Sequence, residues 1–214
     1  MEPHTRIEAL YHLFAIDQPA AAAACEALDR EFTDGGRPEV RHALALALRE
    51  LTTGGWLTGS AQVEALLAPL RVRQWRGEAA QLEAEARYVA DLARTASDPS
   101  GIGRTQFLLG DVFEAKGRLD EALAAFRESL AISQRLASLD PSNADWQRDL
   151  AVAHNKLGQA YQGMGNEENA QSSYRSAVEA MERAVAMSPG NVGWKQDLEN
   201  LKSRLSSGGG SLRS

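Results

Sequence analysis

Cysteine and lysine are scarce in this chain of 214 residues, which has one cysteine, Cys25, and four lysines. A single cysteine cannot form an internal disulfide, so nothing in the sequence indicates an oxidising compartment. No stretch approaches the roughly 18 consecutive apolar residues that a membrane-spanning helix needs. We therefore expect a cytoplasmic protein that does not act in a membrane.

Basic charge is also limited. Lysine and arginine total 23 against 29 acidic residues, which gives a net charge of −6. The balance is 10 basic to 15 acidic residues over positions 1–100, and 13 to 14 over the rest. Neither half has the basic excess that nucleic acid or an acidic membrane surface requires. We expect a protein partner and no nucleic acid.

Local motifs for catalysis and for metal binding are missing from the sequence. There is no GxxxxGK[ST] phosphate loop and no GxSxG nucleophile motif. The four histidines lie far from one another and from Cys25, so their spacing does not predict a zinc site. Paired carboxylates such as Glu83 and Glu85 fit a solvated helix face. We predict no catalytic residue, no metal and no cofactor, and one alternative stays open, an enzyme whose site is assembled from distant helices.

Apolar spacing and turn signals predict about ten helices. The leucines of HALALALREL, positions 42–51, alternate with a period of two, but leucine and alanine are strong helix formers, so a helix is predicted there. The first expected helix ends near residue 16. The others are expected over 19–32, 42–51, 61–72, 77–95, 102–116, 119–139, 145–163, 167–186 and 192–205.

Residue types recur at an interval of 48 positions, which predicts a structural repeat. At the turns, Gly117 and Gly165 suit the left-handed end of a helix, and Asn143 and Asn191 suit an N-cap. Matching positions include Gly110 with Gly158, Phe113 with Tyr161, Gly117 with Gly165, Ala122 with Ala170, Phe126 with Tyr174, Arg135 with Arg183, Pro141 with Pro189, Asn143 with Asn191, Trp146 with Trp194, Asp149 with Asp197 and Leu150 with Leu198.

These positions resemble the tetratricopeptide repeat, in which small residues let two helices approach and aromatics fill the gap to the next pair. The first copy has Leu109, Gly110, Phe113, Gly117, Ala122, Phe126 and Ser129, and the second has Leu157, Gly158, Tyr161, Gly165, Ala170, Tyr174, Ala177 and Pro189. The resemblance implies an all-α, right-handed superhelical solenoid of antiparallel helix pairs. The interval of 48 exceeds the usual 34 residues. We interpret it as a long repeat of bacterial type.

Three regions are predicted. Residues 1–59 look like the degenerate helical arms of bacterial signalling NTPases and caspase-like effector systems, and TTGGWLTGS at positions 52–60 is the expected boundary. Residues 60–205 would form the repeat array with a capping helix. Residues 206–214 contain GGGS and are interpreted as a flexible tail.

The resemblance places the first helix of each repeat on the concave, partner-binding face. The candidate contacts are Arg104, Phe107, Asp111 and Glu114 in the first copy and Val152, Asn155, Gln159 and Gln162 in the second. Phe107 is expected to be an apolar anchor beside amide side chains, a surface suited to a helix or an extended segment. Because Asp111 would repel a carboxylate, we expect no binding of chaperone C-terminal tails. Trp56 is either a second anchor or a ring that closes the core.

The sequence thus favours a non-enzymatic adaptor, regulator or inhibitor that binds another protein. An alternative is a sensor or oligomerisation arm of a bacterial signalling or defence system. Self-association depends on the apolar stripe Leu198, Leu201 and Leu205. If this stripe covers the preceding repeat, a monomer is expected, and if it projects outward, a homodimer.

Overall fold

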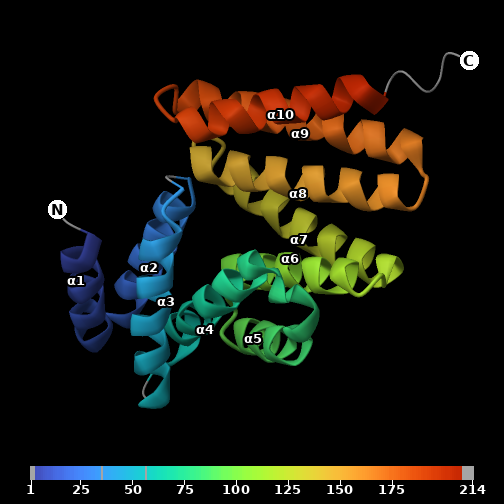
Figure 1. The fold of residues 1–214 in the computed structure, drawn as a ribbon. Coiled ribbons are helices and arrows are strands. Elements are labelled where there is room, and N and C mark those ends of the chain that lie inside the picture. Colours follow the sequence, from blue (N-terminus) through green and yellow to red (C-terminus); the bar gives the residue numbers. More distant parts are fainter. Residues whose placement is uncertain (1–2, 35, 56, 209–214) are drawn as a thin grey trace, which may run out of the picture. The chain divides into compact units, whose positions relative to one another are not determined.

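The computed structural model describes residues 3–34, 36–55 and 57–208, and it confirms the predicted all-helical fold (Figure 1). Within those ranges there are ten α helices and no strand. The helices are α1 (Pro3–Ile16), α2 (Gln18–Asp34), α3 (Pro38–Thr53), α4 (Gly59–Arg73), α5 (Glu83–Thr95), α6 (Pro99–Ala115), α7 (Leu119–Leu139), α8 (Ala144–Gly163), α9 (Glu167–Met187) and α10 (Val192–Gly208). The chain divides into two compact units, unit 1 over residues 1–112 and unit 2 over residues 113–214.

The first four helices of unit 1 share one hydrophobic core. It joins Phe14 of α1, Cys25 of α2 and Leu44 of α3 to Ala65 of α4. Cys25 is fully buried in it, as expected for a small apolar side chain. This core contains residues on both sides of position 59, and the predicted boundary at that position stays a prediction.

The leucine-rich helix α3 shows why the period of two did not make a strand. Leu44 and Leu48, four residues apart, are each 1% exposed, whereas Leu46 is 49% exposed. An α helix turns alternate residues onto different faces, so Leu44 and Leu48, an i, i+4 pair, point into the core and Leu46 does not. The helix prediction for this segment is confirmed.

One predicted helix start was wrong. The helix expected from residue 77 begins at Glu83, after a π-helical turn over Gln74–Glu78 and a 3-10 turn over Ala79–Gln81. Gly77 has φ +84°, a left-handed conformation that ends regular α-helical hydrogen bonding. Sequence periodicity could not reveal that turn, because alanine and glutamate on either side favour helix.

The joints of unit 2 use the repeated residues as expected. Asn143 Oδ1 accepts a hydrogen bond of 3.1 Å from the backbone N of Trp146, and Asn191 Oδ1 accepts one of the same length from the backbone N of Trp194. Gly117 and Gly165 have φ +71° and +72° at the ends of α6 and α8. Both pairs therefore rebuild the same local geometry 48 residues apart.

The capping bond can be tested directly. Replacing Asn143 with alanine should lower the free energy of unfolding by about 1 kcal/mol, because the first turn of α8 loses its side-chain acceptor. Urea unfolding followed by far-UV circular dichroism measures this change. Gln134→Ala on the exposed side of α7 is the control and should be nearly neutral. Equal effects of the two substitutions would contradict the capping role.

The apolar stripe of α10 faces the core of unit 2. Leu198 and Leu201 are buried with Trp194 in a cluster that also includes Met181 of α9, and Leu205 packs against it. The stripe therefore covers the preceding helices, the arrangement that the sequence associates with a monomer. Trp56 and the tail beyond Gly208 lie outside the described residues.

Candidate partner-binding face

The exposed side of α8 carries all four candidate residues of the second copy. We call Val152, Asn155, Gln159 and Gln162 the α8 face. Gln162 is exposed and the other three are half-buried. The opposite side of α8 packs into unit 2, where Leu157 is buried. Next to Gln162, a Cβ built on Gly158 would lie 2.5 Å from the ring of Tyr174 of α9.

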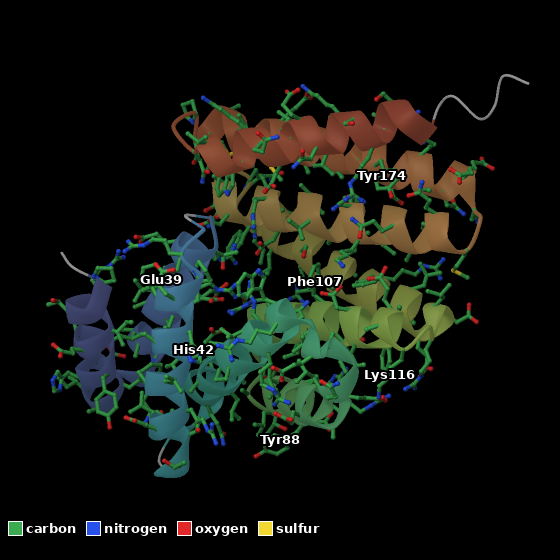
Figure 2. All side chains as sticks on the ribbon, viewed as in Figure 1. Glu39, His42, Tyr88, Phe107, Lys116 and Tyr174 are labelled. Atoms are coloured by element: carbon green, nitrogen blue, oxygen red, sulfur yellow. The ribbon has the colours of Figure 1, made fainter. Side chains whose placement is uncertain are left out.

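The amide groups of the α8 face are only partly engaged within the chain. Tyr174, labelled in Figure 2, donates a hydrogen bond of 3.0 Å from its hydroxyl to Gln162 Oε1. Among the described residues, the side chain of Gln159 has no hydrogen-bond partner, and Asn155 Oδ1 has none either. Tyr174 therefore orients the Gln162 amide and Gln159 keeps its hydrogen-bonding capacity, whereas the unpaired Asn155 oxygen is buried.

Glu114, the last candidate of the first copy, lies in unit 2. Its Oε2 is 3.4 Å from Lys156 Nζ on α8, and the same ammonium lies 5.7 Å from the centre of the Phe126 ring. The two charges of this half-buried pair offset each other beside the α8 face. The α8 face therefore borders a paired charge rather than an isolated one.

The other three candidates belong to unit 1 and have different surroundings. Phe107 is half-buried on α6 (Figure 2). The side chain of Arg104 is 14% exposed and donates to Glu64. Asp111 is buried and accepts a short hydrogen bond from Gln74. Arg104 and Asp111 both hold polar contacts within unit 1.

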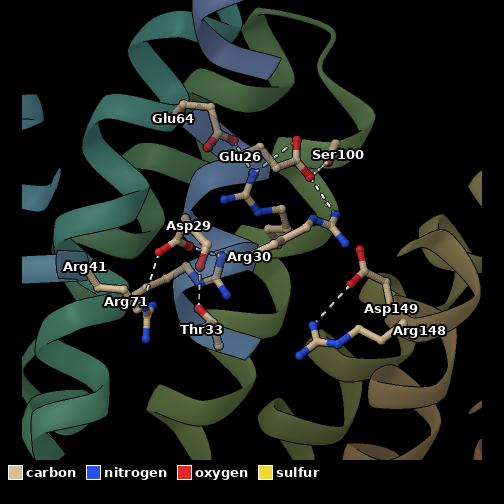
Figure 3. Close-up of polar contacts among 11 residues, drawn as sticks. Glu26, Asp29, Arg30, Thr33, Arg41, Glu64, Arg71, Ser100, Arg148 and Asp149 are labelled. Atoms are coloured by element: carbon tan, nitrogen blue, oxygen red, sulfur yellow. Dashed lines mark hydrogen bonds and ion pairs between the residues drawn. The ribbon is translucent and has the colours of Figure 1, made fainter. Parts of the chain in front are cut away.

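Arg104 is part of a buried network that sequence reasoning missed, here called the ion cluster (Figure 3). It joins charged side chains of α2, α3, α4 and α6 within unit 1. Its members are Glu26, Asp29, Arg30, Arg41, Glu64, Arg71 and Arg104. A sequence signal was available, because Asp29 follows Cys25 by four positions and Glu64 precedes Ala68 by four, which puts both acids beside buried apolar positions.

Asp29 is held by two arginines. Its Oδ1 lies 3.0 Å from Arg41 Nε and its Oδ2 lies 2.6 Å from Arg71 Nη1, while its side chain is 1% exposed. Burial opposes ionisation of the carboxyl, but Arg71 and Arg41 outweigh burial and hold the pKa of Asp29 below its usual value. Asp29 is therefore an ionised anchor between α2, α3 and α4.

Glu64 has a less complete set of partners. Arg104 Nη1 donates to its Oε1, but its Oε2 is buried without a hydrogen-bond partner. Burial raises the pKa of Glu64 to about 7, against the opposing effect of the Arg104 guanidinium. Within the ion cluster, the pKa of Asp29 is therefore lowered and the pKa of Glu64 is raised.

The described part of the chain has neither a metal-binding cluster nor a membrane-spanning helix. No group of three or more His, Cys, Asp or Glu side chains within it is placed to hold a metal ion. None of its helices is both long and apolar enough to cross a bilayer.

Comparison with known proteins places the α8 face in a family context. Residues 103–136, within α6 and α7, and residues 151–180, within α8 and α9, match the family model described as tetratricopeptide repeat. Two segments of the chain therefore match the tetratricopeptide repeat. The predicted resemblance is confirmed for these segments, and the repeats indicate a helical solenoid. Tetratricopeptide repeats generally mediate protein–protein interaction and are typically not enzymes.

A solved structure supports the fold over the whole chain. The crystal structure of BtubC (BKLC) from P. vanneervenii matches with a TM-score of 0.56 and 13% sequence identity, and the match covers 99% of this chain and 90% of that chain. At this identity the similarity concerns the fold. A search of curated protein sequences gives no match.

Proposed function

We propose that this chain is a non-enzymatic protein-interaction module that holds an extended segment of a partner protein on the α8 face. The observation that carries the proposal is the row of amides Asn155, Gln159 and Gln162 along one side of a helix in a tetratricopeptide-repeat segment, with Gln162 exposed and the other two half-buried. The module would serve as an adaptor, regulator or inhibitor by occupying that segment. We place it in the cytoplasm.

The spacing of the amides suits an extended peptide. At 1.5 Å per residue, Asn155 and Gln159 are about 6 Å apart along the helix axis, and Gln159 and Gln162 about 4.5 Å. An extended chain presents equivalent peptide groups about every 6.6 Å, because its pattern repeats every two residues. A side-chain amide has both a donor and an acceptor, which a peptide group can satisfy. Gln159 offers both, and Gln162 offers its amide nitrogen while its oxygen accepts from Tyr174. A helical segment has most of its peptide groups satisfied internally, so we favour an extended one.

The charges near this face agree with a protein partner. Glu114 and Lys156 offset each other, and the whole chain has a net charge of −6. Amide recognition of main-chain groups needs no charge on the partner and no terminal carboxylate. Phe107 of unit 1 is proposed as a separate apolar contact.

A photo-crosslinking experiment tests the proposal. A benzophenone amino acid is placed at position 159 of the full chain, and in a control at position 175 on the exposed side of α9. In lysate of the source cells, we expect a protein crosslinked at position 159 and not at position 175.

The captured partner is then purified and its affinity measured by calorimetry. The double variant Asn155→Ala, Gln159→Ala should weaken binding by about tenfold, the effect of losing roughly two hydrogen bonds. Ser172→Ala with Arg175→Ala is the matched control on α9 and should leave the affinity unchanged. The same loss in both double variants, or in neither, would exclude the α8 face as the binding site.

A further inference from the structure

The ion cluster holds α6 against α2 and α4 in unit 1. Arg104 of α6 donates to Glu64 of α4, and its Nη1 also lies 3.4 Å from Glu26 Oε2 on α2. Ser100 at the start of α6 donates a hydrogen bond of 3.1 Å to Glu26 Oε1. A Cβ built on Gly101 would lie 2.8 Å from Val63 Cγ1, so the start of α6 packs closely on α4. Polar and apolar contacts thus meet at one junction.

The Arg104 guanidinium contacts two carboxyls at this junction, those of Glu26 and Glu64, and their surroundings differ. Glu26 has further partners, Arg30 Nη2 at 2.7 Å and Ser100. Burial opposes its ionisation, but Arg104 and Arg30 outweigh burial and hold the pKa of Glu26 below its usual value. Glu26 is therefore ionised near neutral pH and already compensates Arg104. Glu64 is the additional acid, with a side chain 4% exposed.

Ionisation of Glu64 carries a cost that its surroundings do not offset. An ionised carboxylate can accept about four hydrogen bonds, yet Glu64 Oε2 is buried with none. The negative charge of Glu26 adds repulsion, whereas Arg104 and, more weakly, Arg71 favour the charged form. The neutral acid avoids the desolvation cost while keeping an oxygen that accepts from Arg104.

The other groups around Glu64 do not change this balance. On α2, burial raises the pKa of the Cys25 thiol well above its usual value, so this group is uncharged near neutral pH. Asp29 on the same helix is compensated by Arg41 of α3 and Arg71 of α4. The buried residues of α5 are all apolar: Ala86, Val89, Ala90 and Ala93.

We propose that Glu64 is a proton-sensitive element of unit 1, which holds α6 against α2 and α4 more firmly when Glu64 is protonated than when it is ionised. The sign follows from linkage. A carboxyl whose pKa is higher in the folded chain, about 7, than the ordinary 4.5 contributes stability that is complete below pH 4.5. That contribution is lost as pH rises toward and through 7. Unit 1 then opens more readily at slightly alkaline pH.

Hydrogen exchange of the full chain tests this proposal. Protection factors of peptides from α4 and α6, corrected for intrinsic exchange rates, should fall by about tenfold between pH 6 and pH 8 in the wild type. In Glu64→Gln, which keeps the side-chain shape and cannot ionise, the fall should disappear. Glu39→Gln on the exposed side of α3 is the control and should keep it. A fall that persists in Glu64→Gln would overturn the proposal.

A second measurement keeps the proposal testable if Glu64→Gln does not fold. The ¹³C shift of the Glu64 side-chain carboxyl is followed by NMR in the wild type across pH 4 to 9. A titration midpoint near 7 supports the proposal. A midpoint near the ordinary value of 4.5 would show that Arg104 keeps Glu64 ionised throughout the neutral range, and would overturn it.

Discussion

Replacing Gly158 with alanine is expected to lower the free energy of unfolding by about 3 kcal/mol, because the new methyl group has no room. A Cβ at this position would lie 2.5 and 2.6 Å from two ring carbons of Tyr174. The ring cannot move away easily, because the residue is 1% exposed and its hydroxyl is bonded to Gln162. The close approach of α8 and α9 therefore depends on glycine. Urea unfolding followed by far-UV circular dichroism measures the effect.

Gly163 provides the matched control in the same helix. A Cβ there would meet no atom within 4 Å, and the position is exposed. Gly163→Ala should leave stability unchanged or raise it by up to about 1 kcal/mol, because alanine restricts the unfolded chain. In a double-mutant cycle, Tyr174→Ala should remove most of the extra cost of Gly158→Ala. Additive effects would show that the two residues do not limit each other.

Replacing Asp29 with alanine should cost about 3 to 5 kcal/mol, because Arg41 and Arg71 would lose the buried anion that compensates them. A guanidinium does not lose its proton in the accessible pH range, so these arginines cannot neutralise themselves. Asp91→Ala is the control, since that side chain is 77% exposed and its ion pair with Arg94 is on the surface. It should change stability by less than about 1 kcal/mol. Equal effects in thermal unfolding would contradict the role of Asp29.

The contribution of Asp29 to stability should depend on pH in the opposite direction to that of Glu64. Its pKa is lower in the folded chain than the ordinary 3.8, so its stabilisation is complete above pH 3.8. It is lost as pH falls through the lowered folded value. The difference in stability between wild type and Asp29→Ala should therefore shrink below about pH 3.8. A difference that stays constant down to pH 2 would be inconsistent with an ionised Asp29 in the native state.

The amino-acid sequence by itself determined the helices and the joints between them. Asn143 and Asn191 cap their helices, and Gly117 and Gly165 take left-handed conformations at helix ends, as predicted. These features depend on backbone groups within a few residues, so they can be derived from local sequence. The one misplaced start, at Gly77, arises because a glycine inside a helix-favouring segment permits both outcomes.

Only the tertiary structure decided which polar side chains face outward. Asp111 and Gln159 are equivalent candidates, 48 positions apart, yet Asp111 is buried and accepts from Gln74 within unit 1, while Gln159 has no partner among the described residues. Glu64, an unremarked acid in the sequence, is 3% exposed and meets an arginine 40 positions away. Such pairings depend on which helices pack together and at what rotation. The physical reason is that burial and opposing charge act through space, so distant segments set the environment of each side chain.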